Sequence, residues 1–250
     1  MGAKKNTFSK INAFIILIFL IMMFVMNQKY VCLNKKLYPV DIRELSIDCS
    51  IDRNPDLEKL QYFKSLECFS LSFLPESISY EVKYIETLNR LEKLRFSYCS
   101  VEDLTFIKSL NQLCSFHIFQ SDVDFSDLEN DSLKEISIWE SHVIEFKAIE
   151  KISTLESIDI INIDGVTTNK LYETLKKLPN LKKMRLTSSS FAEDLSELEK
   201  LEELEIAGQF DYLTILSIPS LKKITISENI LSNQEIEKLK ECGVSVTFFN

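Results

Sequence analysis

Histidine, cysteine and glycine are the residues that most often mark chemistry in a short sequence, and here each is sparse or badly spaced for it. The chain has two histidines, His117 and His142, and they form neither an H-E-x-x-H zinc motif nor part of a G-x-S-x-G hydrolase turn. Its four glycines lie too far apart for a phosphate-binding loop. His117 is the one conceivable acid–base group, and a lone exposed histidine is more often inert. We therefore predict a non-enzymatic protein with no catalytic residue, cofactor or metal site.

An apolar segment lies near the N-terminus, between lysines. Residues 13–26 form an unbroken apolar run that Ile11 and Asn12 extend backwards, and three lysines precede it. Sixteen residues in a helix span about 24 Å, and flanking lysines that reach toward the headgroups bridge much of the gap to a roughly 30 Å hydrocarbon core. We predict a basic leader over 1–10, a transmembrane or signal-anchor helix over 11–26 and a juxtamembrane stalk over 27–40.

Cleavage and orientation depend on the residues that flank this segment. Phe24, Val25 and Met26 end the run and are bulkier than a signal-peptidase site prefers, which favours an uncleaved anchor. Equal numbers of lysines on the two sides leave the positive-inside rule undecided, whereas the short leader favours an exported body. The expected location is thus a single-pass membrane protein with an extracytoplasmic body. The alternatives are secretion after cleavage and a body that faces the cytoplasm.

Charge is divided unevenly along the chain. Residues 1–36 carry six lysines and no acid, so a formal net charge of −9 for the whole chain leaves −15 for residues 37–250. A body this acidic repels phosphate backbones, and we therefore predict that nucleic acid is not a partner. A basic protein face is accommodated more easily, although the acidic charge also serves simply to keep the body soluble.

One six-residue pattern, L-x-x-L-x-L, recurs nine times from residue 42 onward. It begins with leucine in eight of nine copies, and the starts are 20 to 26 residues apart; the first residues are Ile42, Leu66, Leu91, Leu113, Leu133, Leu155, Leu181, Leu201 and Leu221. Because alternate strand residues share a face, the fourth and sixth positions point to one side and the fifth and seventh to the other. A single such strand cannot bury its apolar face, whereas stacked parallel copies share one core.

The third copy, LEKLRFSYCSVEDLTFIKSL from Leu91 to Leu110, resembles the internalin-type repeat of the leucine-rich-repeat family, with Cys99 at the ninth position. The resemblance covers about four-fifths of the chain. It implies an α/β solenoid over 41–250, with a curved parallel sheet on the concave side and short helices and turns on the convex side, in addition to the N-terminal hydrophobic helix. The copies depart from the family where the ninth position holds serine, leucine or isoleucine instead of asparagine. We therefore expect irregular turns.

The two ends of the repeat region are also patterned. Ser232 and Glu235 form a capping-box pattern that opens a short helix toward Lys240, and Gly243 ends it. Val244, Val246 and Phe248 then alternate as a final capping strand. This strand must be a sheet edge, at which a partner or a second copy has backbone groups to pair with.

The repeat register also indicates whether the six cysteines can form disulfides. The sequence has no C-x-x-C pair, and cysteines in neighbouring repeats stand about 15 Å or more apart along the strands, too far for a disulfide. We predict free thiols. This argues against an oxidising exterior and therefore against the exported body.

The resemblance implies that the concave face carries the contacts with a partner. Apolar residues occupy three successive seventh positions, and aromatic residues adjoin them at the eighth. Together with polar fifth positions they form the predicted partner-binding set of Phe73, Tyr98, Arg95, His117, Phe119, Trp139, Ile161, Asp159 and Arg185. A loop folded over these residues, or a register shifted by one, is the alternative. Charges of alternating sign occupy three neighbouring fifth positions, Asp159, Arg185 and Glu205. We interpret them as ion pairs between adjacent strands and not as a contact with a ligand.

These patterns together predict a membrane-anchored, non-enzymatic module that recognises a protein or another macromolecule through its concave face. The alternative is a structural scaffold that self-associates or assembles membrane complexes through the edges of the solenoid. The sequence leaves the oligomeric state and the identity of the partner open.

Overall fold

A computed structural model describes residues 29–50, 55–187, 195–208, 212–228 and 230–249, together with Ile16 and Ile18; the side chains of residues 77–80 are not among them. The predicted leader at 1–10 lies outside the described residues, and so does nearly all of the predicted helix at 11–26. Among the residues that are described, no helix has the length and apolar character needed to cross a membrane.

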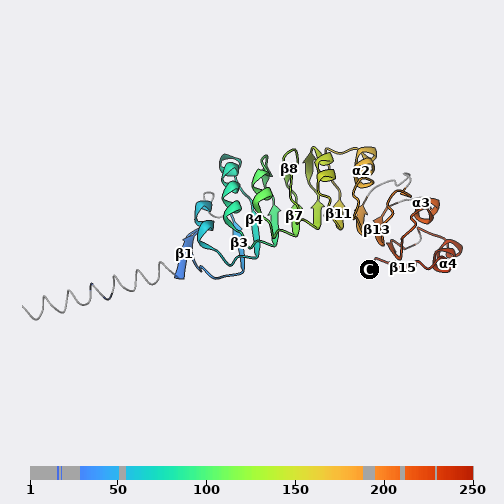
Figure 1. The fold of residues 1–250 in the computed structure, drawn as a ribbon, viewed down its shortest axis with the longest axis horizontal. Coiled ribbons are helices and arrows are strands. Elements are labelled where there is room, and N and C mark those ends of the chain that lie inside the picture. The colour runs from blue at the N-terminus through green and yellow to red at the C-terminus, as the bar shows by residue number, and fades with distance from the viewer. Residues whose placement is uncertain are drawn as a thin grey trace, which may run out of the picture.

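One parallel sheet runs through the described part of the chain and lines the inner side of a curved body (Figure 1). Nine of its strands carry the nine hexads, and the tenth is the predicted terminal strand. They are β3 (Glu44–Asp48), β4 (Cys68–Ser72), β5 (Lys93–Ser97), β7 (Ser115–Phe119), β9 (Glu135–Trp139), β11 (Ser157–Ile161), β12 (Lys183–Thr187), β13 (Glu203–Ala207), β14 (Lys223–Ile226) and β15 (Ser245–Phe248). Each strand pairs with the next copy in the same register, as the repeat pattern predicts.

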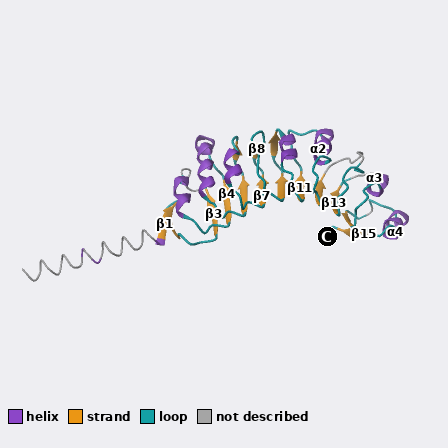
Figure 2. Ribbon diagram, viewed as in Figure 1, coloured by secondary structure: helices purple, strands orange, loops and turns teal. Residues whose placement is uncertain are grey.

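Short helices and a small second sheet cover the outer side of the curve (Figure 2). The 3₁₀ helices are η1 (Leu57–Tyr62), η2 (Glu76–Thr87), η3 (Thr105–Ser109) and η4 (Phe146–Lys151). The α-helices are α2 (Thr168–Leu175), α3 (Tyr212–Leu216) and α4 (Asn233–Glu241). Three short parallel strands, β6 (Ser100–Val101), β8 (Asp122–Asp124) and β10 (His142–Ile144), form the second sheet.

The core lies between these two sides. The fourth and sixth positions of the hexads are buried throughout; Phe116, Ile136 and Ile138 have no exposed area, and Ile118 is 1% exposed. From the convex side, residues such as Leu104 and Ile107 close the same apolar space. A one-residue shift of register would expose all of these side chains, so the register is the predicted one.

The segment before the first repeat differs from the prediction. Strands β1 (Tyr30–Leu33) and β2 (Lys36–Pro39) form an antiparallel hairpin. Asn34 and Lys35 make its two-residue turn with positive φ, as hairpin turns of this length require. Val31 and Leu33 are buried in the solenoid core. Residues 30–39 therefore cap the N-terminal end of the core, because burial of two alternate apolar side chains holds them against the first repeat. Most of the segment predicted as a juxtamembrane stalk over 27–40 thus belongs to the folded body.

The C-terminal end matches its prediction. Ser232 and Glu235 form the reciprocal capping box at the start of α4, and Gly243 with φ +85° follows that helix. β15 pairs with β14 on one side and is the last strand of the sheet. Its outer edge is not paired with any strand of the described chain. The hairpin thus covers the core at the N-terminal end without pairing with β3, and both β3 and β15 are edge strands of the ten-stranded sheet.

Candidate functional site

Three rows of side chains cross the concave face, one more than the sequence analysis expects. The register aligns the predicted fifth positions as one row and the predicted seventh positions as another. The third positions form a further row on the same face, which includes Lys93, Ser115 and Glu135. Alternate residues of a strand share a face, and the third residue lies two positions before the fifth. This alternation in the sequence was the signal that could have identified the row.

Aromatic side chains form a row, here named the aromatic wall, along the end of the strands. Phe73 and Tyr98 stack with their ring centroids 4.5 Å apart, and Tyr98 meets Phe119 edge to face at 5.5 Å. Trp139 stands beside Phe119 in the next strand and is 37% exposed. Phe73 and Tyr98 are each 43% exposed, so these rings face solvent although they contact one another.

The backbone turn at the end of each strand positions this wall. Phe73 and Tyr98 have φ of 56° and 55°, and the residues that follow Phe119, Trp139 and Ile161 also adopt positive φ. Positive φ is costly for bulky side chains. It recurs at five successive turns, so the turn belongs to the repeat, whereas aromatic side chains at two of these turns are particular to this surface.

Serine side chains at the ninth position, here named the serine ladder, connect successive turns by hydrogen bonds. Ser121 Oγ accepts a hydrogen bond of 3.0 Å from the buried backbone N–H of Cys99, and Ser141 Oγ accepts one of 3.2 Å from Ser121 N–H. Each hydroxyl donates in turn to a carbonyl in its own repeat, those of Phe119 and Trp139. The expectation that serine at the ninth position leaves the turns irregular is wrong for these repeats, because the shorter side chain still reaches the neighbouring N–H.

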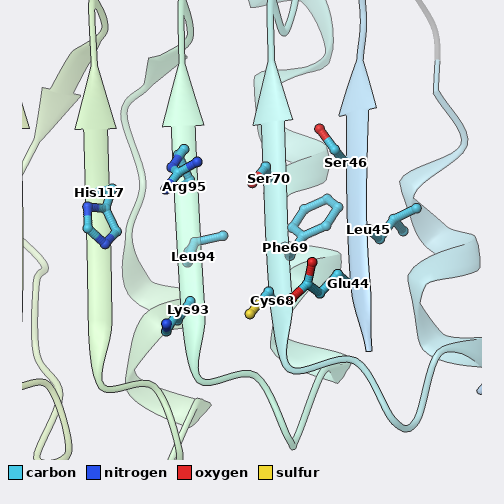
Figure 3. Close-up of a pocket in the computed structure, with 10 residues that line it drawn as sticks. All are labelled: Glu44, Leu45, Ser46, Cys68, Phe69, Ser70, Lys93, Leu94, Arg95 and His117. Carbon is cyan, nitrogen blue, oxygen red and sulfur yellow. The ribbon is translucent and has the colours of Figure 1, made fainter. Parts of the chain in front are cut away.

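Two adjoining hollows occupy the concave face. The first, here named the polar hollow, has a volume of about 500 Å³ and lies over β3, β4, β5 and β7; Figure 3 shows Lys93, Arg95 and His117 on its side nearer the middle of the sheet. The second, named the apolar hollow, has a volume of about 410 Å³ and is lined in part by Phe119 and Trp139. Arg95 and His117 line both, so the two hollows share a border.

The polar groups around His117 do not form a catalytic triad. Ser115 Oγ lies 2.6 Å from His117 Nε2 and donates to Glu135 Oε2 at 3.1 Å. Because the hydroxyl has a single proton, His117 Nε2 must be the donor in the other bond, and it offers no lone pair to activate the serine. Ser115 is also only 2% exposed. The cluster fixes the His117 ring and has no accessible nucleophile.

The electrostatic surroundings of His117 keep it neutral. Burial lowers the pKa of His117, and the positive charges of Arg95 and Lys93 lower it further, whereas Glu135 opposes them. At neutral pH the ring therefore acts as a polar hydrogen-bonding surface beside the cation of Arg95.

The ion-pair ladder predicted at the far end of the face is present. Arg185 contacts Asp159 at 3.3 Å on one side and Glu205 at 2.5 Å on the other. Burial raises the pKa of Asp159, and the charge of Arg185 and the nearby Trp139 side chain oppose that rise. In the third row Lys183 pairs with Glu203 at 2.9 Å. Charges in this half are thus satisfied within the protein.

The structure divides the predicted partner-binding residues into two groups. The first surrounds the hollows or joins the aromatic wall beside them, and it consists of Phe73, Tyr98, Arg95, His117, Phe119 and Trp139. Ile161 borders this group next to Trp139 and is partly buried. Asp159 and Arg185 belong instead to the internal ladder. The residues that sequence reasoning missed are Lys93, Ser115 and Glu135 of the third row.

All six cysteines lie in the described residues, and none of them forms a disulfide there, as predicted. Cys68 is on the concave face in the polar hollow, and burial raises the pKa of its thiol. Its thiolate is therefore disfavoured, and the residue contributes a small polar surface to the hollow.

Comparison with known proteins places the fold. No family model and no curated protein matches the sequence. Among solved structures, an internalin (InlF) from Listeria monocytogenes is 18% identical with a TM-score of 0.55, over 82% of this chain and 61% of that chain. A protein from Bacteroides fragilis is 15% identical with a TM-score of 0.53, over 86% of this chain and 75% of that chain. TLR13, solved in complex with ssRNA13, is 15% identical with a TM-score of 0.53, over 82% of this chain and 35% of that chain.

These likenesses concern the fold alone, since identity is low throughout. The chain spans less than two thirds of the internalin and about a third of TLR13. Together with the in-register parallel sheet and the repeated buried hexads, they establish the architecture that the repeats predict. The chain has the leucine-rich-repeat solenoid fold.

Proposed function

We propose that the protein is a non-enzymatic recognition module that binds a protein partner through the two hollows of its concave face. The observation that carries this proposal is the exposed aromatic wall: Phe73, Tyr98 and Trp139 are each more than a third exposed, and they lie together along one rim. Large apolar side chains held at a solvent-facing rim cost solubility and concentrate binding energy once a partner covers them.

The acidic body favours a protein partner over nucleic acid. A net charge of −15 over residues 37–250 repels a phosphate backbone. The far half of the concave face, where Arg185 and Lys183 are already paired, has few cations to offer such a backbone.

Site-specific photo-crosslinking tests the proposal. A photoreactive phenylalanine analogue replaces Phe119 in the full chain expressed in its own cells, and the matched control carries it at Ile144, which is 47% exposed on β10. The expected result is a discrete crosslinked protein from position 119 that is absent from position 144. Equal yields from both positions, or crosslinks at neither, would contradict recognition through the concave face.

We further propose that residues 11–26 anchor this module in a membrane, with the solenoid on the extracytoplasmic side. The support is the uncharged apolar run between lysines and the absence of small residues at its end. Carbonate extraction of membranes and protease treatment of intact cells test this. Release by carbonate contradicts the anchor, and protection of the solenoid from external protease contradicts the orientation.

A structural scaffold is the second candidate, and the open edge of β15 favours it. This strand has no charged residue, and Phe248 on it is 42% exposed. Uncharged open edges pair readily with other strands. Mass photometry of the purified chain distinguishes the two candidates. A concentration-dependent dimer that Phe248→Pro abolishes supports self-assembly, because the N–H groups of Ser245 and Phe249 point to β14 and that of Phe248 therefore points to the open side. A monomer at all concentrations excludes it.

A further inference from the structure

Two cations of the polar hollow have no ion partner among the described residues. Arg95 is exposed, and neither it nor Lys93 forms a salt bridge with any residue in the described part of the chain. Arg185 in the same row is bound on both sides by carboxylates, and Lys183 in the same row as Lys93 is paired. The same register that neutralises one half of the face thus leaves two cations available in the other half.

The surroundings of Arg95 leave its guanidinium group accessible to a ligand. In its row the neighbours are Ser70 and His117, the one small and the other kept neutral by burial. Four acidic side chains, Glu44, Glu67, Glu92 and Glu135, lie near this hollow, and none of them forms a salt bridge with Arg95 or Lys93. Glu135 accepts a hydrogen bond from Ser115, and Glu44 stands two strands from Lys93. Figure 3 shows Arg95 and His117 on neighbouring strands, and Glu44, the acidic residue drawn there, two strands from Arg95.

Guanidinium geometry indicates what the hollow would bind. The planar fork of arginine matches a carboxylate in a bidentate arrangement, and such a contact is strongest where few competing groups are present. The net charge of the body is acidic, so long-range electrostatics oppose the approach of an acidic ligand, although a short segment with one or two carboxylates is repelled less than a phosphate backbone. The recognition must therefore come from direct contact within the hollow.

The distance between Arg95 and Trp139 sets the spacing of the two ligand groups that these residues would contact. Trp139 lies two strands away and two residues further along its strand. Strands about 4.8 Å apart and residues about 3.3 Å apart give roughly 12 Å between the two positions, which an extended chain covers in three to four residues.

We propose that the concave face recognises an acidic, extended segment of a protein partner, whose carboxylate binds Arg95 beside Lys93. An aromatic or large apolar side chain three to four residues from that carboxylate then packs against Trp139 and Phe119. This inference rests on the proposed function and adds the chemistry of the ligand to it.

Peptide selection with a charge reversal tests the inference. A displayed library of random twelve-residue peptides is selected on the full chain in lipid nanodiscs, and in parallel on Arg95→Glu and on Trp139→Ala. Arg90→Glu is the matched control, because Arg90 is exposed outside the strands and carries the same change of charge. The wild type is expected to enrich Asp or Glu three to four residues from an aromatic or large apolar residue. Synthetic copies should bind Arg95→Glu at least tenfold more weakly and Arg90→Glu with unchanged affinity.

Each outcome bears on one proposal or on both. Enrichment of lysine or arginine in place of the acid by Arg95→Glu would support the contact directly. Peptides that need Trp139 but lack acids, or that bind Arg95→Gln and wild type alike, overturn acidic recognition and leave the proposed function intact. Failure to find any peptide that distinguishes wild type from Trp139→Ala counts against both. Circular dichroism confirms that each variant is folded.

Discussion

Replacing Trp139 by alanine separates a partner-binding role for the apolar hollow from a role in the core. Trp139 is 37% exposed, and taking about 250 Å² for a tryptophan leaves about 90 Å² for a partner to cover. At about 25 cal/mol per Å² this area contributes about 2.3 kcal/mol, or about 50-fold in Kd. Phe116 has no exposed area, and its replacement by alanine should cost about 3–5 kcal/mol of folding stability. The same cost scaled by the buried share of Trp139 gives at most about 2–3 kcal/mol.

The assay uses the partner captured by the photo-crosslinker at position 119. Trp139 is the only tryptophan of the chain, so its fluorescence reports on the apolar hollow alone, and a blue shift is expected when the partner covers it. Isothermal titration gives the Kd of the wild type and of Trp139→Ala, and urea unfolding followed by circular dichroism gives their stabilities. Ile144→Ala, on the opposite side, should change neither the affinity nor the spectrum. Partner affinity of Trp139→Ala within twofold of the wild type, or a stability loss equal to that of Phe116→Ala, would refute the reasoning.

Three further predictions concern the groups around the hollows. Burial lowers the pKa of His117 below its ordinary value of 6.5, so the histidine of the unfolded chain takes up a proton at a higher pH than that of the folded chain. The contribution of His117 to the free energy of unfolding should therefore be complete above pH 6.5 and decrease as the pH falls below it. In urea unfolding, His117→Gln should lack this part of the pH dependence. Arg185→Gln should lower the free energy of unfolding by about 1 kcal/mol at pH 7 and by less at pH 4, where Asp159, whose pKa is raised, begins to take up a proton; equal losses at both pH values would contradict the ladder. Ser121→Ala leaves the buried N–H of Cys99 without its acceptor and should cost about 1–3 kcal/mol, with faster hydrogen exchange at that amide; an unchanged exchange rate would show that the serine ladder is dispensable.

The sequence alone was sufficient to predict the solenoid and its register. Periodicity of two within a strand is a local property, and a leucine-led hexad repeated nine times leaves one consistent assignment of inside and outside. Phe119 and Trp139 could therefore be placed side by side on the concave face before any coordinates. The capping box at Ser232 was equally local, and it is present.

Contacts between repeats depended on the tertiary structure. Whether Ser121 reaches the N–H of Cys99 depends on the spacing and tilt of adjacent turns, which lie 22 residues apart in the chain. The hairpin at 30–39 was missed because Val31 and Leu33 gain their stability from burial against the first repeat, although the turn residue Asn34 marks it in the sequence.

The candidate site shows the same division. Residue types and register determined that Arg95 and Arg185 share a row. The register also predicted the carboxylates on both sides of Arg185, and they are present. Only the folded chain decided that Lys183 pairs with Glu203 while Lys93, in the same row, forms no salt bridge with a described residue, because such pairing depends on how side chains of neighbouring repeats are spaced. Side-chain charge is set by the sequence, but its neutralisation is a matter of which strands the solenoid brings together.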